Sequence, residues 1–213
     1  LAALREAGSP YPLLGVHIGP FTLPWRMMSA TRPTAAVPHP NMILVPQYVT
    51  DSVLHARLRE LNGSVVFQTE LTALSQDERG VTATLAHHGA EHTVRARYLV
   101  GADGGGSLVR QALGIEFPGE THDDDRMIIA DAVTTGLRDD RWHIWPGRSG
   151  RFVAACPLPG SEPVFQWMIR LATDDEPGVT REAIEERIQA RTRNSRVQLR
   201  DAVSYTHLTL PTS

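Results

Sequence analysis

The chain has 213 residues, enough for one or two domains, and 41% hydrophobic with 21% charged residues is the composition of a soluble globular protein. A net charge of −3 gives no support to a nucleic-acid or anionic-membrane role, and no apolar run approaches the roughly 20 residues that span a bilayer. All 21 basic residues are arginine, which excludes lysine-dependent mechanisms, and the single cysteine, Cys156, excludes an internal disulfide. We therefore expect a cytoplasmic protein without nucleic-acid or membrane partners.

The first 70 residues predict one helix–strand unit preceded by irregular chain. A helix ends at Gly8, where glycine and the following Ser9-Pro10 break stop it. Leu54, Leu58 and Leu61 share one helical face, since they follow i, i+4, i+7 spacing. The expected elements are the end of a helix over residues 1–8, irregular chain with two short strands over 10–40, a strand over 42–45, a helix that Thr50 or Asp51 caps and that runs to about Asn62, and a strand over 64–68.

Alternating apolar and polar residues then predict a three-stranded antiparallel meander over 71–74, 81–85 and 92–97. It leads into Tyr98-Leu99-Val100, which is apolar enough for a strand covered on both faces. His87, His88 and His92 lie in or beside one of the turns without an acid or cysteine at ligand spacing, so we expect a solvated hairpin there and no metal site.

The second half predicts a mostly antiparallel sheet flanked by one helix. Thr180 is expected to cap that helix, with Ile184 and Ile188 on its inner face. Four strand candidates precede it, over residues 127–133, 142–145, 152–155 and 165–171. The fold class is therefore α/β with α+β elements, and the expected domains are residues 1–120 and 121–202.

The stretch from Gly101 to Arg110 carries the chemistry. Asp103 follows the expected strand at its carboxyl end, where open α/β sheets place their ligands. Gly104–Gly106 allow positive φ and close backbone approach. Ser107 is a plausible N-cap for a short helix over 108–113, whose free N–H groups would favour a phosphate. Loop chemistry alone leaves open a plain strand-to-helix turn.

The string Gly101-Ala102-Asp103-Gly104, followed by Ser107, Val109 and Arg110, closely resembles the Asp-Gly motif of the class A flavoprotein monooxygenases. These aromatic-ring hydroxylases use FAD and NAD(P)H. Leu113-Gly114-Ile115-Glu116-Phe117-Pro118-Gly119-Glu120 extends the likeness. The resemblance implies an incomplete Rossmann-like, doubly wound FAD-binding sheet carrying the meander, and a substrate domain with the second sheet.

The resemblance also implies cofactor-binding residues. Asp103, Gly104 and Arg110 match the motif that helps to hold FAD and the transient NAD(P)H. Gln47, in Val45-Pro46-Gln47, matches a glutamine that contacts the FAD ribose and pyrophosphate; without the resemblance it is a helix-entry residue facing solvent. Leu71 matches a position where the main chain meets the adenine.

As implied by the family, NAD(P)H reduces FAD, O₂ adds to give a flavin C4a-hydroperoxide, and one oxygen passes to a small aromatic or polyketide-like substrate. Catalytic residues and oligomeric state are not indicated. A halogenase, an epoxidase or an isoprenoid reductase on the same scaffold remains an alternative, as does a non-catalytic binding fragment. The pool of candidate substrate-facing residues is Trp142, Trp145, Phe152, Phe165 and Trp167, and for each of them core packing is the favoured interpretation.

Two family motifs are not present: the Gly-x-Gly-x-x-Gly fingerprint and the later Gly-Asp motif. We therefore expect a fragment of a longer enzyme, inactive by itself. Residues 203–213 resemble the translation of a transposase sequencing adapter and are expected not to be native.

Overall fold

The computed structural model describes residues 2–147, 151–172, 175, 178 and 180–212, with residues 120–125 and 201–212 described by their backbone alone. Its contacts divide the chain into two units. Leu1–Leu54 and Glu120–Ser213 form the first unit, and His55–Gly119 form the second. These units are defined by contacts, so the functional domain boundaries near residue 120 stay a prediction.

A seven-stranded sheet forms the core of the first unit, in the order β12-β8-β11-β10-β9-β2-β3. All its pairings in the described chain are antiparallel except that of β2 with β9, where Leu14 lies opposite Trp142. The mostly antiparallel sheet that the sequence predicted is therefore confirmed. Its strands are β2 (Leu13–Ile18), β3 (Phe21–Trp25), β8 (Glu120–Thr135), β9 (Arg141–Trp145), β10 (Val153–Pro157), β11 (Val164–Arg170) and β12 (Gln198–Thr212).

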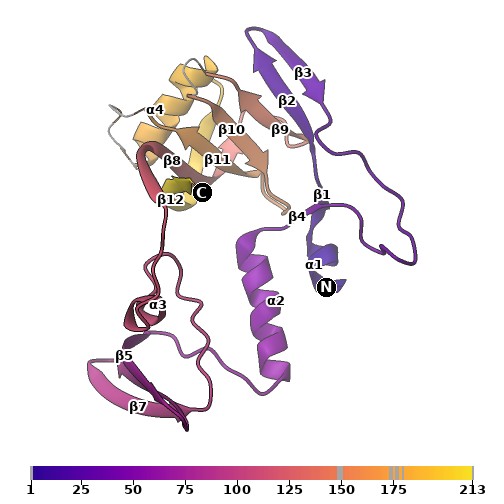
Figure 1. Cartoon of the computed structure of the whole chain (residues 1–213). Helices are drawn as coiled ribbons and strands as arrows, with labels where there is room; N and C mark the ends of the chain where they lie inside the picture. Colours follow the sequence, from indigo (N-terminus) through magenta and orange to yellow (C-terminus); the bar gives the residue numbers. More distant parts are fainter. Residues whose placement is uncertain (1, 148–150, 173–174, 176–177, 179, 213) are drawn as a thin grey trace. The chain divides into compact units, whose positions relative to one another are not determined.

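One face of this sheet is covered by α4 (Arg181–Thr192) (Figure 1). Thr180 caps the helix by accepting a hydrogen bond from the Ala183 N–H at 3.3 Å, as the sequence predicted. Ile184 and Ile188 are fully buried in the same cluster as Trp167. Burial of apolar side chains on one face is the main contribution that holds a helix on a sheet, so these two isoleucines fix α4 in place.

The N-terminal segment adds short elements to the first unit. Helix α1 (Ala2–Ala7) ends at Gly8, as predicted, and β1 (Ser9–Pro10) pairs with β4 (Ile43–Leu44). The stretch over residues 10–40, predicted as irregular chain with two short strands, contains the β2–β3 hairpin, although the sequence did not predict where its strands lie. These strands join the sheet formed by the C-terminal half of the chain.

The predicted meander is confirmed in the second unit (Figure 1). Strands β5 (Thr69–Asp77), β6 (Gly80–His87) and β7 (Ala90–Ala96) pair antiparallel in sequence order. Alternating side chains and short turns are sufficient to specify such a hairpin series from local sequence. Helix α3 (Leu108–Ala112) lies against β5.

Two predicted strands are wrong. Residues 64–68 and 98–100 are not hydrogen-bonded into a sheet, and Tyr98 and Val100 are 85% and 88% exposed. A strand is stable only when its backbone groups pair with a neighbouring strand. No described strand pairs with either segment, and most of their apolar side chains are exposed.

Helix α2 (Gln47–Glu60) begins before Thr50 and Asp51, the two residues that the sequence predicted as its cap. The carbonyl of Pro46 accepts hydrogen bonds from the N–H groups of Val49 and Thr50 at 3.1 and 3.2 Å. The first turn therefore forms without a side-chain cap from Thr50. This start makes Gln47 the first helical residue.

A double-capped loop at the Asp-Gly motif

The segment from Gly101 to Arg110 forms a closed corner between extended chain and α3. The Asp103 carboxylate accepts two hydrogen bonds: Oδ1 from the Ser107 hydroxyl at 2.5 Å and Oδ2 from the Val109 N–H at 3.1 Å. Ser107 Oγ accepts from the Arg110 N–H at 3.0 Å, which makes Ser107 the N-cap that the sequence predicted. Two side chains therefore cap one short helix.

Two glycines are required by the geometry of this corner. Gly104 has φ of +76°, a conformation that L side chains rarely adopt. At Gly101 an added Cβ would lie 2.8 Å from a methyl group of Val109, so only glycine allows α3 to approach so closely. The sequence pattern Gly-x-Asp-Gly is thus explained by one positive φ and one close approach.

Arg110 braces the loop from the helix side. Its Nη1 donates to the Gly105 carbonyl at 2.6 Å, and its guanidinium carbon lies 4.6 Å from the centre of the Phe117 ring. The Gln111 amide donates to the Gly106 carbonyl at 3.0 Å. The loop thus keeps one shape by hydrogen bonds at both ends, and a cation–π contact holds the arginine.

These contacts set the charge of the corner. The hydrogen bond from Ser107, followed by that from the Val109 N–H, lowers the pKa of Asp103 below its ordinary value. The carboxylate is therefore ionised at neutral pH. The expectation that free N–H groups of this helix favour a phosphate is wrong, because two of them already donate to Ser107 and Asp103 and a carboxylate stands beside them.

The same corner fits a hydroxyl-bearing group. Each oxygen of an ionised carboxylate has two acceptor positions, and each Asp103 oxygen uses one of them here. Space is open around Gly104, Gly105 and Gly106, where an added Cβ would have no neighbour within 4 Å. The sugar-alcohol chain or ribose of a flavin nucleotide offers the hydroxyl donors that such a carboxylate accepts, so these residues fit FAD.

The structure brings together three of the five predicted cofactor residues. Asp103, Gly104 and Arg110 belong to this corner, and Leu71 lies on β5, the strand against which α3 packs. Leu71 is half-buried beside a register shift in β5. Since β5 is an edge strand of the meander, part of its main chain has no strand partner. Gln47 is exposed at the start of α2, in the first unit.

The predicted aromatic candidates divide into two groups. Trp145, Phe165 and Trp167 are buried under α4, and the Trp167 indole N–H donates to Thr134 Oγ1 at 3.0 Å. They are core residues. The half-buried Trp142 alternates with Trp145 along β9 and therefore lies on the opposite face of the sheet.

Tyr11 contacts Trp142 edge to face, with ring centres 5.7 Å apart. Phe152, just before β10, is half-buried. Among the candidates, Trp142 and Phe152 are thus the ones with surface left to meet a ligand.

A hydrogen-bonded histidine pair was missed by sequence reasoning. His143 Nε2 lies 2.7 Å from the Arg138 carbonyl, His143 Nδ1 lies 2.9 Å from His17 Nε2, and His17 Nδ1 lies 3.1 Å from Thr22 Oγ1. Because the carbonyl only accepts, each histidine donates from Nε2 and accepts at Nδ1. Burial lowers the pKa of both rings, that of His17 to about 4, so both are neutral.

The two histidines are 126 residues apart in sequence. They meet only because β2 and β9 pair in parallel, with Gly15 opposite His143. Neither residue has a sequence neighbour that suggests the other, and no local pattern could have identified the pair.

Neither a metal-binding cluster nor a membrane-spanning helix is found in the described part of the chain. It contains no group of three or more His, Cys, Asp or Glu side chains placed to hold a metal ion. Within the same residues, no helix is both long enough and apolar enough to cross a membrane.

The class of protein to which the mixed α/β fold belongs comes from comparison with known proteins. Residues 5–209 match the FAD binding domain family. The chain belongs to this family.

Two curated relatives and one solved structure illustrate the likeness. A flavin-dependent monooxygenase of Mycobacteroides abscessus is 33% identical over 206 residues, which are 93% of this chain and 43% of the relative. The 12-dehydrotetracycline 5-monooxygenase/anhydrotetracycline 6-monooxygenase of Streptomyces rimosus is 44% identical over 96 residues, 44% of this chain and 18% of the relative. Aklavinone-11 hydroxylase, solved with FAD and aklavinone, superposes with a TM-score of 0.77 at 22% identity, covering 98% of this chain and 42% of the other.

The chain therefore spans less than half the length of the curated relatives it matches. At 22% identity, the likeness to the hydroxylase structure is a likeness of fold.

Proposed function

We propose that this chain is part of an FAD- and NAD(P)H-dependent monooxygenase that hydroxylates a small aromatic or polyketide-like substrate. The observation that carries the proposal is the Asp103 corner, because its ionised carboxylate, open glycines and closing arginine suit a hydroxyl-bearing nucleotide. The family match over residues 5–209 supports the cofactor, and relatives named as monooxygenases support the reaction class.

Each cofactor residue has a definite task in this proposal. Asp103 accepts hydrogen bonds from flavin hydroxyl groups with its remaining lone pairs, and Gly104 keeps the loop clear of the ligand. Arg110 holds the loop through the Gly105 carbonyl and supplies a positive charge beside it. Gln47 contributes an exposed amide, and Leu71 contributes the main chain of an edge strand.

FAD bound by these residues would supply the redox chemistry, in which two electrons from NAD(P)H and one O₂ give one oxygen atom to the aromatic ring and one to water. The chain's own residues bind the cofactor and orient the substrate. Trp142 and Tyr11 form an aromatic corner on the sheet face opposite α4, which suits stacking against a planar substrate. The histidine pair keeps β2 and β9 in register without adding charge.

The test uses the uninterrupted reading frame that contains this chain. The purified protein is expected to be yellow, to consume NAD(P)H when an aromatic substrate is added, and to place one atom of ¹⁸O₂ in the product. A colourless protein that neither binds FAD nor oxidises NAD(P)H contradicts the proposal.

Two substitutions locate the cofactor contact. Asp103→Asn keeps the shape but removes the charge, and we expect the Kd for FAD to rise about tenfold, the effect of one lost hydrogen bond to a charged group. Glu78→Gln removes an equal charge from the exposed β5–β6 turn and serves as the matched control. Equal affinities in the two variants would remove Asp103 from the site.

A further inference from the structure

The hairpin of β2 and β3 presents an exposed apolar face at the outer edge of the seven-stranded sheet (Figure 1). Residues directly opposite each other on paired strands share a face of the sheet, and the register places Val16 opposite Leu23 and Ile18 opposite Phe21. Phe21 is 70% exposed, and Ile18, Leu23 and Trp25 are between 52% and 59% exposed. These four side chains lie on one face and are called the hairpin face below.

The free edge of β3 is closed to a further strand by Pro24. A two-residue turn closes on a pair whose backbone groups bond each other, here Ile18 and Phe21, and such pairs alternate with unbonded pairs along an antiparallel ladder. Gly15 and Pro24 therefore form an unbonded pair, so the Pro24 nitrogen, which has no hydrogen, lies on the free edge. Proline at this position prevents addition of another strand. A partner of the hairpin must therefore contact its side chains.

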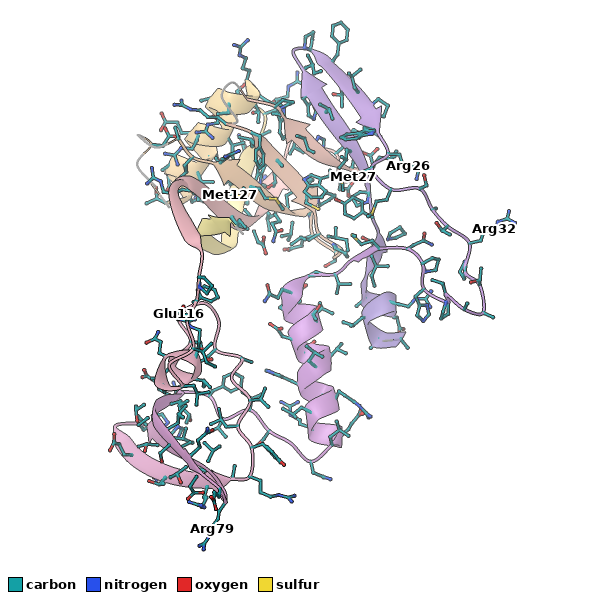
Figure 2. The ribbon with its side chains drawn as sticks, in the orientation of Figure 1. Arg26, Met27, Arg32, Arg79, Glu116 and Met127 are labelled. Carbon is teal, nitrogen blue, oxygen red and sulfur yellow. The ribbon has the colours of Figure 1, made fainter. Side chains whose placement is uncertain are left out.

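The hairpin face carries no charge. The chain contains no lysine, and no Asp, Glu or Arg lies between Glu6 and Arg26. Figure 2 shows Arg26 where the chain leaves β3, at the base of the hairpin. The one titratable side chain of the hairpin, His17, bonds Thr22 on the reverse face and is neutral because burial lowers its pKa to about 4.

This lack of charge selects among the possible partners. In a two-fold contact each surface meets a copy of itself, so a charge at its centre would meet a like charge. An uncharged apolar surface is complementary to its own copy. It has no charge with which to attract an acidic or basic protein or the anionic surface of a membrane.

We infer that two copies of this chain pack their hairpin faces against each other, about a two-fold axis that passes near Leu23. A fully covered aromatic side chain buries about 150–250 Å², so the exposed parts of the four side chains supply roughly 450 Å² from each copy. Two copies bury roughly 900 Å² in this way, and with the surrounding rim they reach the low end of specific interfaces, about 1,200 Å². We therefore expect a dimer with a Kd in the micromolar range. Trp142 lies opposite Leu14, one strand further into the sheet, and is outside the contact.

Self-association of the 213-residue chain is measured by sedimentation equilibrium from low to high micromolar concentration. The mass is expected to rise from that of a monomer to that of a dimer and to stop there, because a two-fold contact closes at two copies. A monomer at every concentration would overturn the inference, and so would a mass that continues to rise past the dimer.

Two aromatic residues of equal exposure provide a matched pair of variants. Phe21 and Tyr48 are both 70% exposed, and Tyr48 lies on α2, outside the hairpin. Phe21→Asp places two carboxylates in one apolar contact and is expected to raise the dimer Kd at least about tenfold. Tyr48→Asp adds the same charge and is expected to leave the Kd unchanged. An equal effect of the two variants would contradict the inference.

Single cysteines test which face of the hairpin is covered. Leu23→Cys places a thiol on the hairpin face near the axis, whereas Thr22→Cys places one on the reverse face of the same strand. The native Cys156 is 2% exposed and does not compete. With diamide as oxidant, the Leu23→Cys chain is expected to form disulfide-linked dimers at least about tenfold faster than the Thr22→Cys chain. Equal rates would show random collision and refute the contact.

The Leu23→Cys and Thr22→Cys substitutions are then made in the uninterrupted reading frame that contains this chain. Preferential cross-linking through Leu23→Cys is expected there too. Its loss would show that another segment of the same protein covers the hairpin face, and would overturn the inference. No arm needs bound flavin or turnover, so a negative result leaves the monooxygenase proposal standing, and a colourless full-length protein leaves the dimer contact standing.

Discussion

Replacing Ser107 with alanine tests the double cap of α3 directly. The Ser107 hydroxyl makes two hydrogen bonds, to Asp103 Oδ1 at 2.5 Å and from the Arg110 N–H at 3.0 Å, and the residue is only 9% exposed. Loss of an N-cap serine costs about 1 kcal/mol. A helix of five residues depends mainly on its caps, of which Asp103 remains in this variant, so the cost falls on local opening.

The predicted effect is measurable at two groups, the Arg110 amide and the Asp103 carboxyl. Hydrogen exchange at the Arg110 amide should become about fivefold faster, the equivalent of about 1 kcal/mol. The pKa of the Asp103 carboxyl, followed by its carbon chemical shift, should rise toward its ordinary value because the hydrogen bond that lowers it most is gone. Both measurements use the same labelled sample.

Two comparison variants make the result decisive. Ser64→Ala changes an exposed serine of the same unit and should alter neither observable. Ser107→Thr retains the hydroxyl and should restore most of the Arg110 protection. If Ser107→Ala leaves both the exchange rate and the Asp103 pKa unchanged, the double cap does not exist in solution.

Three further measurements test the first unit. Ile188→Ala should lower the free energy of unfolding by about 2–5 kcal/mol because the side chain is fully buried, while Glu186→Ala on the exposed face of α4 should change it by less than about 0.5 kcal/mol. His17 has a pKa of about 4 in the folded protein against 6.5 for the free ring, so the unfolded chain binds more protons between these values and stability should fall as pH drops from 6.5 toward 4. That loss is on the order of 1–2 kcal/mol after solvent screening at this half-buried ring; a His17→Gln protein with the same pH profile would refute it. Burial raises the pKa of Cys156 to about 12, so the thiol should react with a disulfide reagent only in denaturant, and rapid labelling of the native protein would contradict its placement.

Local sequence was sufficient to predict the elements whose hydrogen bonds join residues close together in the chain. The meander follows from alternation and short turns, and the caps at Thr180 and Ser107 follow from side chains that accept nearby N–H groups. At the Asp-Gly motif the sequence identified Asp103, Gly104 and Arg110. It did not indicate that the Asp103 carboxylate would itself cap α3, because Asp103 precedes the first helical residue by five positions.

Non-local pairing was beyond sequence reasoning. Apolar residues at 98–100 indicated a buried strand, but a strand also needs a neighbour, and none of the described strands provides one. The parallel contact of β2 with β9 joins residues more than 120 positions apart and determines both the extent of the large sheet and the histidine pair. The bridge from the Asn41 side chain to the main chain of Thr31 likewise joins two parts of a loop, and no periodicity predicts it.

The capping of α3 by two side chains has an entropic consequence for the binding of a ligand. Ordering a flexible loop at the moment of binding costs roughly 0.5–1.5 kcal/mol for each side chain immobilised. Here Asp103, Ser107 and Arg110 already hold one another before any ligand arrives. The loop is preorganised, so the free energy of its contacts with a nucleotide is available as affinity and is not consumed in arranging the loop.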